Sequence, residues 1–138
     1  MPAQSSTELT NLTHSLMPFA AQLGIEIVRG DAAGVVARAV WRAENCTTGG
    51  ALHGGFLMGA ADSVGAMCAG FNLPQGAMTS TIESKTNFFR GVTAGELRIE
   101  STPIHVGRTT IVVQTDITRP DGKLVTRTIQ TQAVIKPG

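Results

Sequence analysis

One carboxylate stands alone in a long uncharged stretch of this sequence. Between residues 45 and 82, Asp62 is the only Asp, Glu, Lys or Arg, and most of its neighbours are apolar or glycine. Burying an unpaired carboxylate is costly unless it is hydrogen-bonded. The pattern therefore predicts that Asp62 is strongly desolvated or lines a cavity, and it favours a chemical role over a structural one.

A glycine-rich turn precedes this carboxylate. The segment Leu52-His53-Gly54-Gly55 predicts the start of a helix that continues to about Gly70. Free backbone N–H groups and the positive end of the dipole lie at a helix N-terminus. Such an end suits a carbonyl oxygen that gains negative charge, and Gly54 lets a ligand approach the backbone closely.

The two features are too far apart to act together within one helix. Gly54 and Asp62 are 8 residues apart, which is about 12 Å at the helical rise per residue. We therefore expect them to meet across the two-fold axis of a homodimer. Small residues at Gly59, Ala60 and Gly65 would allow two antiparallel helices to pack closely.

The rest of the chain predicts elements that would surround this helix. Short turns join successive strands, which favours antiparallel pairing. We expect a single α+β domain over residues 1–138, in which an antiparallel sheet of five to six strands wraps around one central helix. Residues 1–20 form a helical N-terminal extension, with a helix at 5–18 ended by Pro18 and with His14 facing solvent. The predicted strands are 24–29, 34–42, 78–89, 96–105, 108–118 and 123–135.

Alternation along the strands predicts which side chains face outward. Glu26 and Arg38 fall on an outer face, and Pro103 predicts an edge position or a bulge. In the last strand, four apolar residues occupy alternate positions and so would share one face: Val125, Ile129, Ala133 and Ile135.

Composition excludes several classes of function. The chain has 138 residues and a net charge of +1, with no basic stripe for nucleic acid. No uncharged apolar run is long enough to span a membrane. Cys46 and Cys68 are too few for a zinc site and predict reduced thiols. The N-terminus lacks the pattern of a signal peptide, which predicts a cytoplasmic protein. The residue pattern predicts no metal and no cofactor.

The motifs together resemble the hotdog-fold acyl-CoA thioesterases of the phenylacetic-acid-pathway and thioesterase superfamily member 2 type. The resemblance covers roughly residues 20–136. It depends on Gly-x-Leu-His-Gly-Gly at 50–55, an Asp nine residues after the His, and the segment 81–90. The motifs Ala-Gly-Glu, His-Val-Gly-Arg-Thr and Asp-Gly-Lys-Leu-Val also fit, at residues 94–96, 105–109 and 121–125.

The resemblance implies a role for each matched residue. Asp62 would act as the nucleophile or as the general base on water, and the Gly54 N–H would hold the thioester carbonyl oxygen. His53 would shape the turn and orient the thioester. Thr81 would position the water or the carboxylate, with Ser80 as a weaker substitute.

The loop before the turn departs from the family pattern. Many relatives carry Asn or Gln six residues before the His, where this chain has Thr47 and its nearest amide is Asn45. Either residue could fill the polar position. Further candidates for binding the substrate are Gly55 in the turn, Arg90, Arg108 and Lys85 for the CoA phosphates, and Phe56, Met58, Phe88 and Phe89 for the acyl group. The alternative is that the charged residues are solvated strand residues and that the aromatic residues and Met58 belong to the core.

The resemblance predicts hydrolysis of an acyl-CoA thioester to a free acid and CoA by a homodimer, with dimers pairing into a tetramer. One alternative is an acyl-CoA-binding hotdog domain without activity. A hotdog hydratase or dehydratase fits less well, because it would hold Asp and His close together, whereas Asp62 follows His53 by nine residues.

Overall fold

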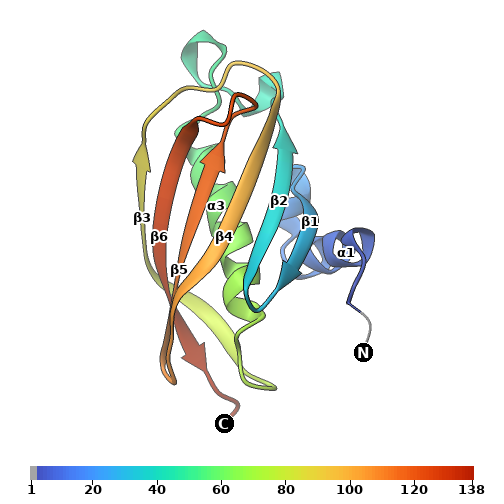
Figure 1. Ribbon diagram of the computed structural model, residues 1–138, viewed down its shortest axis with the longest axis vertical. Coiled ribbons are helices and arrows are strands. Elements are labelled where there is room, and N and C mark those ends of the chain that lie inside the picture. Colours follow the sequence, from blue (N-terminus) through green and yellow to red (C-terminus); the bar gives the residue numbers. More distant parts are fainter. Residues whose placement is uncertain (1–2) are drawn as a thin grey trace.

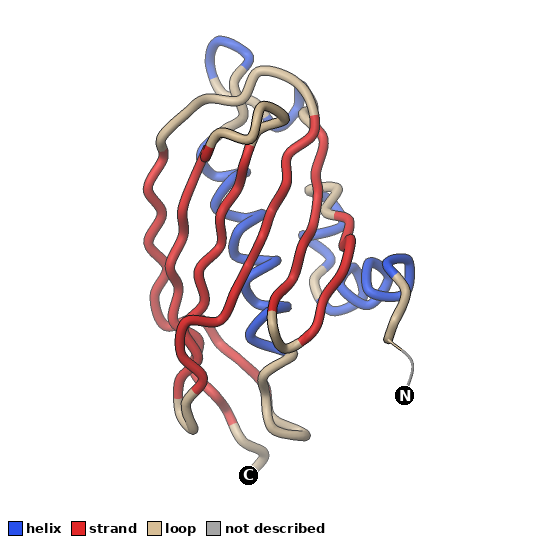
Figure 2. Tube along the Cα trace, viewed as in Figure 1, coloured by secondary structure: helices blue, strands red, loops and turns tan. Residues whose placement is uncertain are grey.

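A long helix, α3 (Gly54–Gly70), lies on one face of a six-stranded antiparallel sheet that curves around it (Figure 1). The computed structural model describes residues 3–138. The expected α+β architecture is confirmed, with a six-stranded sheet and one central helix (Figure 2). The strands are β1 (Glu26–Asp31), β2 (Gly34–Val40), β3 (Met78–Phe88), β4 (Glu96–Val106), β5 (Thr110–Thr118) and β6 (Leu124–Ile135).

The strands are ordered β1-β2-β4-β5-β6-β3 across the sheet. After α3 the chain therefore crosses to the far side of the sheet, and β3 pairs with the last strand, β6. Sequence patterns predicted the strands but not this crossover. Its consequence is that β1 and β3 are the two edge strands.

Helix α3 is buried on all sides except one narrow stripe. Gly55, Met58 and Asp62 are exposed and Ala66 is half-buried, so the open positions recur at helical spacing. Most of the remaining residues of the helix are buried against the sheet and α2. Asp62 lies at the centre of this open stripe.

The small residues of α3 serve contacts within the chain. A Cβ at Gly59 would lie 3.0 Å from the Phe19 ring, and a Cβ at Gly65 would clash with the Gln130 side chain. Ala60 is fully buried. The prediction that these three residues let two helices pack together in a dimer is therefore wrong, because each already faces its own chain.

Two short helices precede the sheet, α1 (Ser6–Leu16) and α2 (Pro18–Gln22). Ser5 and Glu8 form a capping box that starts α1. Pro18 ends α1 as predicted, but it also begins α2 as its first residue, a position that suits proline. Residues 1–2 of the predicted extension lie outside the described residues.

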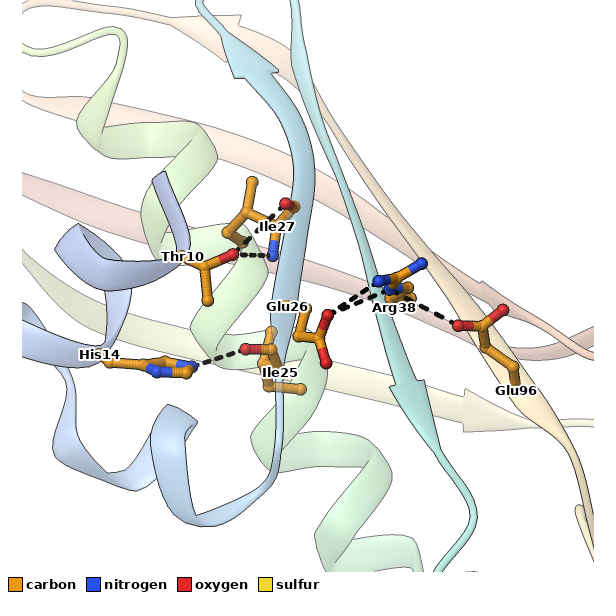
Figure 3. A network of polar contacts seen from close by, with 7 residues as sticks. All are labelled: Thr10, His14, Ile25, Glu26, Ile27, Arg38 and Glu96. Atoms are coloured by element: carbon orange, nitrogen blue, oxygen red, sulfur yellow. Dashed lines mark hydrogen bonds and ion pairs between the residues drawn. The ribbon is translucent and has the colours of Figure 1, made fainter. Parts of the chain in front are cut away.

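Helix α1 lies along the edge of β1 (Figure 3). The Ile27 N–H donates to Thr10 Oγ1 at 2.8 Å, and a ring N–H of His14 donates from Nε2 to the Ile25 carbonyl at 2.7 Å. A carbonyl can only accept, so the ring must be the donor. His14 therefore does not face solvent as predicted. It is half-buried and binds the backbone just before β1.

The outer face of the sheet carries the charges that alternation placed there. Arg38 donates to Glu26 at 2.9 Å and lies 3.6 Å from Glu96, and all three are exposed (Figure 3). The bulge predicted near Pro103 is present, as a register shift between Pro103 and His105. Among the helices formed by the described residues, none is both long and apolar enough to cross a membrane.

The inner face of β6 is polar. Thr126, Thr128, Gln130 and Gln132 are buried and face α3. Among the alternate apolar residues of this strand that were noted in the sequence, Val125 is buried. Ile129 and Ile135 lie on the outer face and are 41% and 49% exposed.

Candidate active site

Two side chains from the sheet hold the Asp62 carboxylate. Gln130 Nε2 donates to Asp62 Oδ1 at 2.8 Å, and Thr81 Oγ1 donates to the same oxygen at a longer 3.4 Å. Gln132 contacts the same hydroxyl: its Nε2 donates to Thr81 Oγ1 at 2.9 Å, and its Oε1, at 3.2 Å, is a nearer acceptor for the single threonine proton than Asp62 is. Asp62 is thus hydrogen-bonded on its sheet side.

Asp62 itself is exposed in the single chain. The prediction of a strongly desolvated carboxylate is therefore not met within one chain, because the stripe of α3 that carries it is uncovered. The clefts beside α1 and β1 and on the outer face of the sheet do not include Asp62 among their lining residues.

The register of β3 decides between Thr81 and Ser80. Thr81 lies opposite Gln132, which faces α3, whereas Ser80 lies opposite Ala133 on the other face of the sheet. Successive strand residues point to opposite faces. Within one chain, Thr81 and not Ser80 therefore faces Asp62.

The N-terminus of α3 is built by His53. Its Nδ1 accepts from the Gly55 N–H at 2.7 Å and caps the helix, so this N–H is already occupied. Within residues 3–138 the Gly54 N–H has no acceptor. A Cβ at Gly54 would lie 3.3 Å from the Phe88 ring, so this aromatic side chain borders the free N–H.

The loop before α3 places Asn45 beside this turn. The His53 N–H donates to the Asn45 carbonyl at 2.9 Å. The side-chain Nδ2 of Asn45 is buried, and within the described residues it has no hydrogen-bond partner. Thr47 is exposed and contributes only its backbone N–H, to Ala51 at 2.8 Å. Asn45 rather than Thr47 therefore has an unused buried donor next to the helix start.

The remaining predicted residues are scattered. Arg90 follows β3 and donates to the Leu124 carbonyl at 2.8 Å, at the end of the sheet where α3 begins. Arg108 lies in the turn between β4 and β5, at the opposite end (Figure 1). Lys85 points to the outer face, because it lies opposite Ile129. Phe56 is only 5% exposed and packs in the core, as the alternative for this residue states.

Apolar side chains near the helix start are half-exposed. Phe88 and Phe89 are 50% and 53% exposed, and Met58 lies on the open stripe of α3 with 43% exposure. Among residues 3–138, no group of three or more His, Cys, Asp or Glu is placed to hold a metal ion.

A sequence profile of the Thioesterase superfamily matches residues 49–126. The chain belongs to this family. The matched segment contains α3, β3, β4 and β5, and with them Gly54, Asp62 and Thr81. Family membership supports thioester hydrolysis as the general reaction of the protein.

Solved structures agree with this assignment. Thioesterase HI1161 of Haemophilus influenzae is 27% identical and superposes with a TM-score of 0.88 over 98% of this chain and 93% of its own. A variant of thioesterase PA1618 of Pseudomonas aeruginosa is 25% identical, with a TM-score of 0.84 over 91% and 93%. A phenylacetic acid degradation-related protein of Ralstonia eutropha is 29% identical, with a TM-score of 0.79 over 85% and 89%. The predicted hotdog fold is thereby confirmed.

Sequence reasoning missed the glutamines of β6. Gln130 contacts the carboxylate directly, and Gln132 contacts it through Thr81. A usable signal was present, because Thr126, Thr128, Gln130 and Gln132 form a polar series at period two. A strand with polar residues on its buried face indicates a polar group opposite it.

Proposed function

We propose that the protein hydrolyses an acyl-CoA thioester to a free acid and CoA, at a site shared by two chains of a homodimer. The observation that supports this is the division of α3 into two half-sites. Its start offers the free Gly54 N–H, and its open middle offers the Asp62 carboxylate. Because α3 is one helix over Gly54–Gly70, these groups are about 12 Å apart in one chain.

In the proposed reaction, the Gly54 N–H holds the thioester carbonyl oxygen as it gains negative charge. Asp62 of the partner subunit takes a proton from water, and the water oxygen attacks the carbonyl carbon. The tetrahedral intermediate then expels CoA as a thiolate, which takes up a proton. Direct attack by the carboxylate, followed by hydrolysis of the anhydride, gives the same products.

The edge of β3 supports the dimer. One side of this strand pairs with β6, and its exposed apolar residues include Met78, Ile82 and Phe88. An unpaired edge of this kind is a template for a second strand. Two β3 strands pairing antiparallel would cover Asp62 with the partner. They would also bring the Arg108 end of one sheet toward the Arg90 end of the other, where both could bind CoA phosphates.

The outer face of the sheet supports pairing of dimers into a tetramer. Ile129, Ile135 and Met78 are exposed there, and Met78 lies directly opposite Ile135. Their combined apolar surface would be buried if two sheets packed face to face.

The proposal is tested by measuring free thiol released from a panel of aryl, short-chain and medium-chain acyl-CoAs. We expect Asp62→Ala to lower kcat by about 10²–10⁴-fold, the usual contribution of a general base. Asp62→Asn should be similarly inactive, and full activity in this variant would overturn the assignment. Binding of acyl-CoA without thiol release by the unmodified protein would instead support the non-catalytic alternative.

Mixing two inactive variants tests whether the site is shared. Gly54→Pro removes the N–H at the first helical position, where proline is tolerated, and Gly54→Ala is the matched control that keeps it. Gly54→Pro alone should lower kcat by about 10²–10³-fold. Random pairing of Gly54→Pro chains with Asp62→Ala chains should restore about a quarter of the activity, because half of the two-fold dimers then hold one intact site. A site within one chain would give no recovery.

A further inference from the structure

Gln130 is the most buried polar group beside the carboxylate. Its side chain is 0% exposed and projects from the inner face of β6 toward α3. Its Nε2 donates to Asp62 Oδ1 at 2.8 Å, whereas Thr81 reaches the same oxygen only at 3.4 Å. An ionised carboxylate only accepts hydrogen bonds, so the amide NH₂ must face Asp62. Gln130 is therefore the stronger of the two donors.

The other end of this amide is unsatisfied. Gln130 Oε1 is buried and, within the described residues, has no hydrogen-bond partner. A buried acceptor without a partner destabilises the folded chain. An apolar side chain of the same size would avoid this loss, so packing alone does not explain a glutamine here.

Gly65 provides the space that this glutamine occupies. A Cβ at Gly65 would overlap Gln130 Oε1 and would lie 3.2 Å from Thr115 Oγ1. Glycine in the interior of a helix is also unfavourable by itself. Gly65 on α3 and Gln130 on β6 are thus each unfavourable on their own. Together they allow the Gln130 side chain to fit beside α3 and to hydrogen-bond Asp62.

We propose that Gln130 is a positioning residue that fixes the Asp62 carboxylate through Oδ1 and thereby makes Oδ2 the reacting oxygen. Among residues 3–138, no side chain or backbone group hydrogen-bonds Oδ2. Oδ2 is therefore the oxygen that takes the proton from water or attacks the carbonyl carbon. Without Gln130 the exposed carboxylate can rotate, and the two oxygens exchange. This inference rests on the proposed function.

The test compares Gln130→Met with Thr128→Val in the full-length protein. Methionine matches glutamine in size and cannot donate to Asp62. Thr128→Val is the control, because it breaks an equally buried hydrogen bond, to Thr86 at 2.7 Å, on the same face of the same strand. For each variant, kcat and KM for acyl-CoA hydrolysis and the melting temperature are measured.

We expect Gln130→Met to lower kcat by about 10²-fold, the loss typical of a misplaced reacting group, with KM unchanged. Its melting temperature should be equal to or above that of the unmodified protein, because the unpaired Oε1 is gone. Thr128→Val should lower the melting temperature and leave kcat unchanged. A structural role for Gln130 predicts the reverse, namely a lower melting temperature with normal kcat, and that result would overturn the proposal.

Gly65→Ala gives a second measurement. It should lower kcat in the chain with Gln130 but cause no further loss when combined with Gln130→Ala, because the overlap then disappears. Additive losses would overturn the assigned role of Gly65. If the unmodified protein released no thiol from any ester, the proposed function would be overturned, and the positioning role of Gln130 would be overturned with it. Full activity of Gln130→Met beside an inactive Asp62→Ala would overturn only the role of Gln130.

Discussion

The two edges of the sheet are alike in sequence character but differ in what covers them. Both edge strands carry an exposed apolar residue at a bulge, Val28 in β1 with 44% exposure and Ile82 in β3 with 63%. At β1, helix α1 of the same chain occupies the edge and binds its backbone. At β3, no helix of the described chain packs along the edge beyond its contact with α3.

This difference shows which edge strand is covered by another element of the same chain. An uncovered strand edge can pair with another chain, and proteins usually block such edges. Here α1 blocks β1, while β3, which also carries Thr81 of the site, stays open. The open edge is therefore the one that the proposed homodimer would use.

The largest effect is expected from a charge on the open edge. Ile82→Lys should prevent pairing of two β3 strands, because an edge lysine opposes strand addition. The dimer should dissociate at micromolar concentration, and thiol release should fall by about 10²-fold or more, since the Gly54 half-site loses its carboxylate. Sedimentation and the thiol assay measure the two effects on the same sample.

Val28→Lys is the matched control for this prediction. It places the same charge at the bulge of the covered edge, so association and activity should stay unchanged. Dissociation of Val28→Lys, or an active dimeric Ile82→Lys, would show that the two edges do not differ in this way.

A smaller effect is expected from loosening the covered edge. Thr10→Val removes the acceptor of the Ile27 N–H and should lower the free energy of unfolding by about 1–2 kcal/mol, the usual consequence of an unpaired buried donor. Activity should persist, because α1 does not reach the site. Thr7→Val is the control on the same helix, and equal stability of the two variants would contradict the covering role of α1. Denaturant titration gives the values.

The smallest effect is expected from the charges beside the covered edge. The hydrogen bond and the charge of Glu26 raise the pKa of Arg38, so Arg38 stays charged throughout the pH range of the folded protein. All partners are exposed, and exposed ion pairs contribute little. The melting temperature of Arg38→Gln should therefore be almost that of the unmodified protein, and added salt should remove any difference between the two. A large fall in melting temperature that persists in high salt would contradict this view.

Much of the fold was predictable because its signals are local. Glycine, proline and alternating apolar residues marked the strands, and the apolar run after His53 marked α3 to within a residue or two. The turn motif and the isolated charge identified Gly54 and Asp62 as candidates in the same way. The pairing of β3 with β6 was not predictable, since it depends on contacts between distant segments.

The environment of Asp62 was predicted incorrectly for a physical reason. Apolar neighbours in the sequence indicated burial, but those neighbours face the core while Asp62 faces the open stripe. Its actual partner, Gln130, is a polar residue on a strand whose apolar residues drew attention to the opposite face. Polar contacts of this kind become visible only when both elements are placed together.

The placement of both half-sites on one helix has a consequence for mixed populations of chains, if the proposed dimer forms. A chain with a single defect, at Gly54 or at Asp62, inactivates one of the two sites in a dimer with a normal chain and leaves the other working. A chain with both defects inactivates both sites of every dimer that it joins. Single lesions in α3 should therefore behave as recessive alleles that complement one another, whereas the double lesion should be dominant.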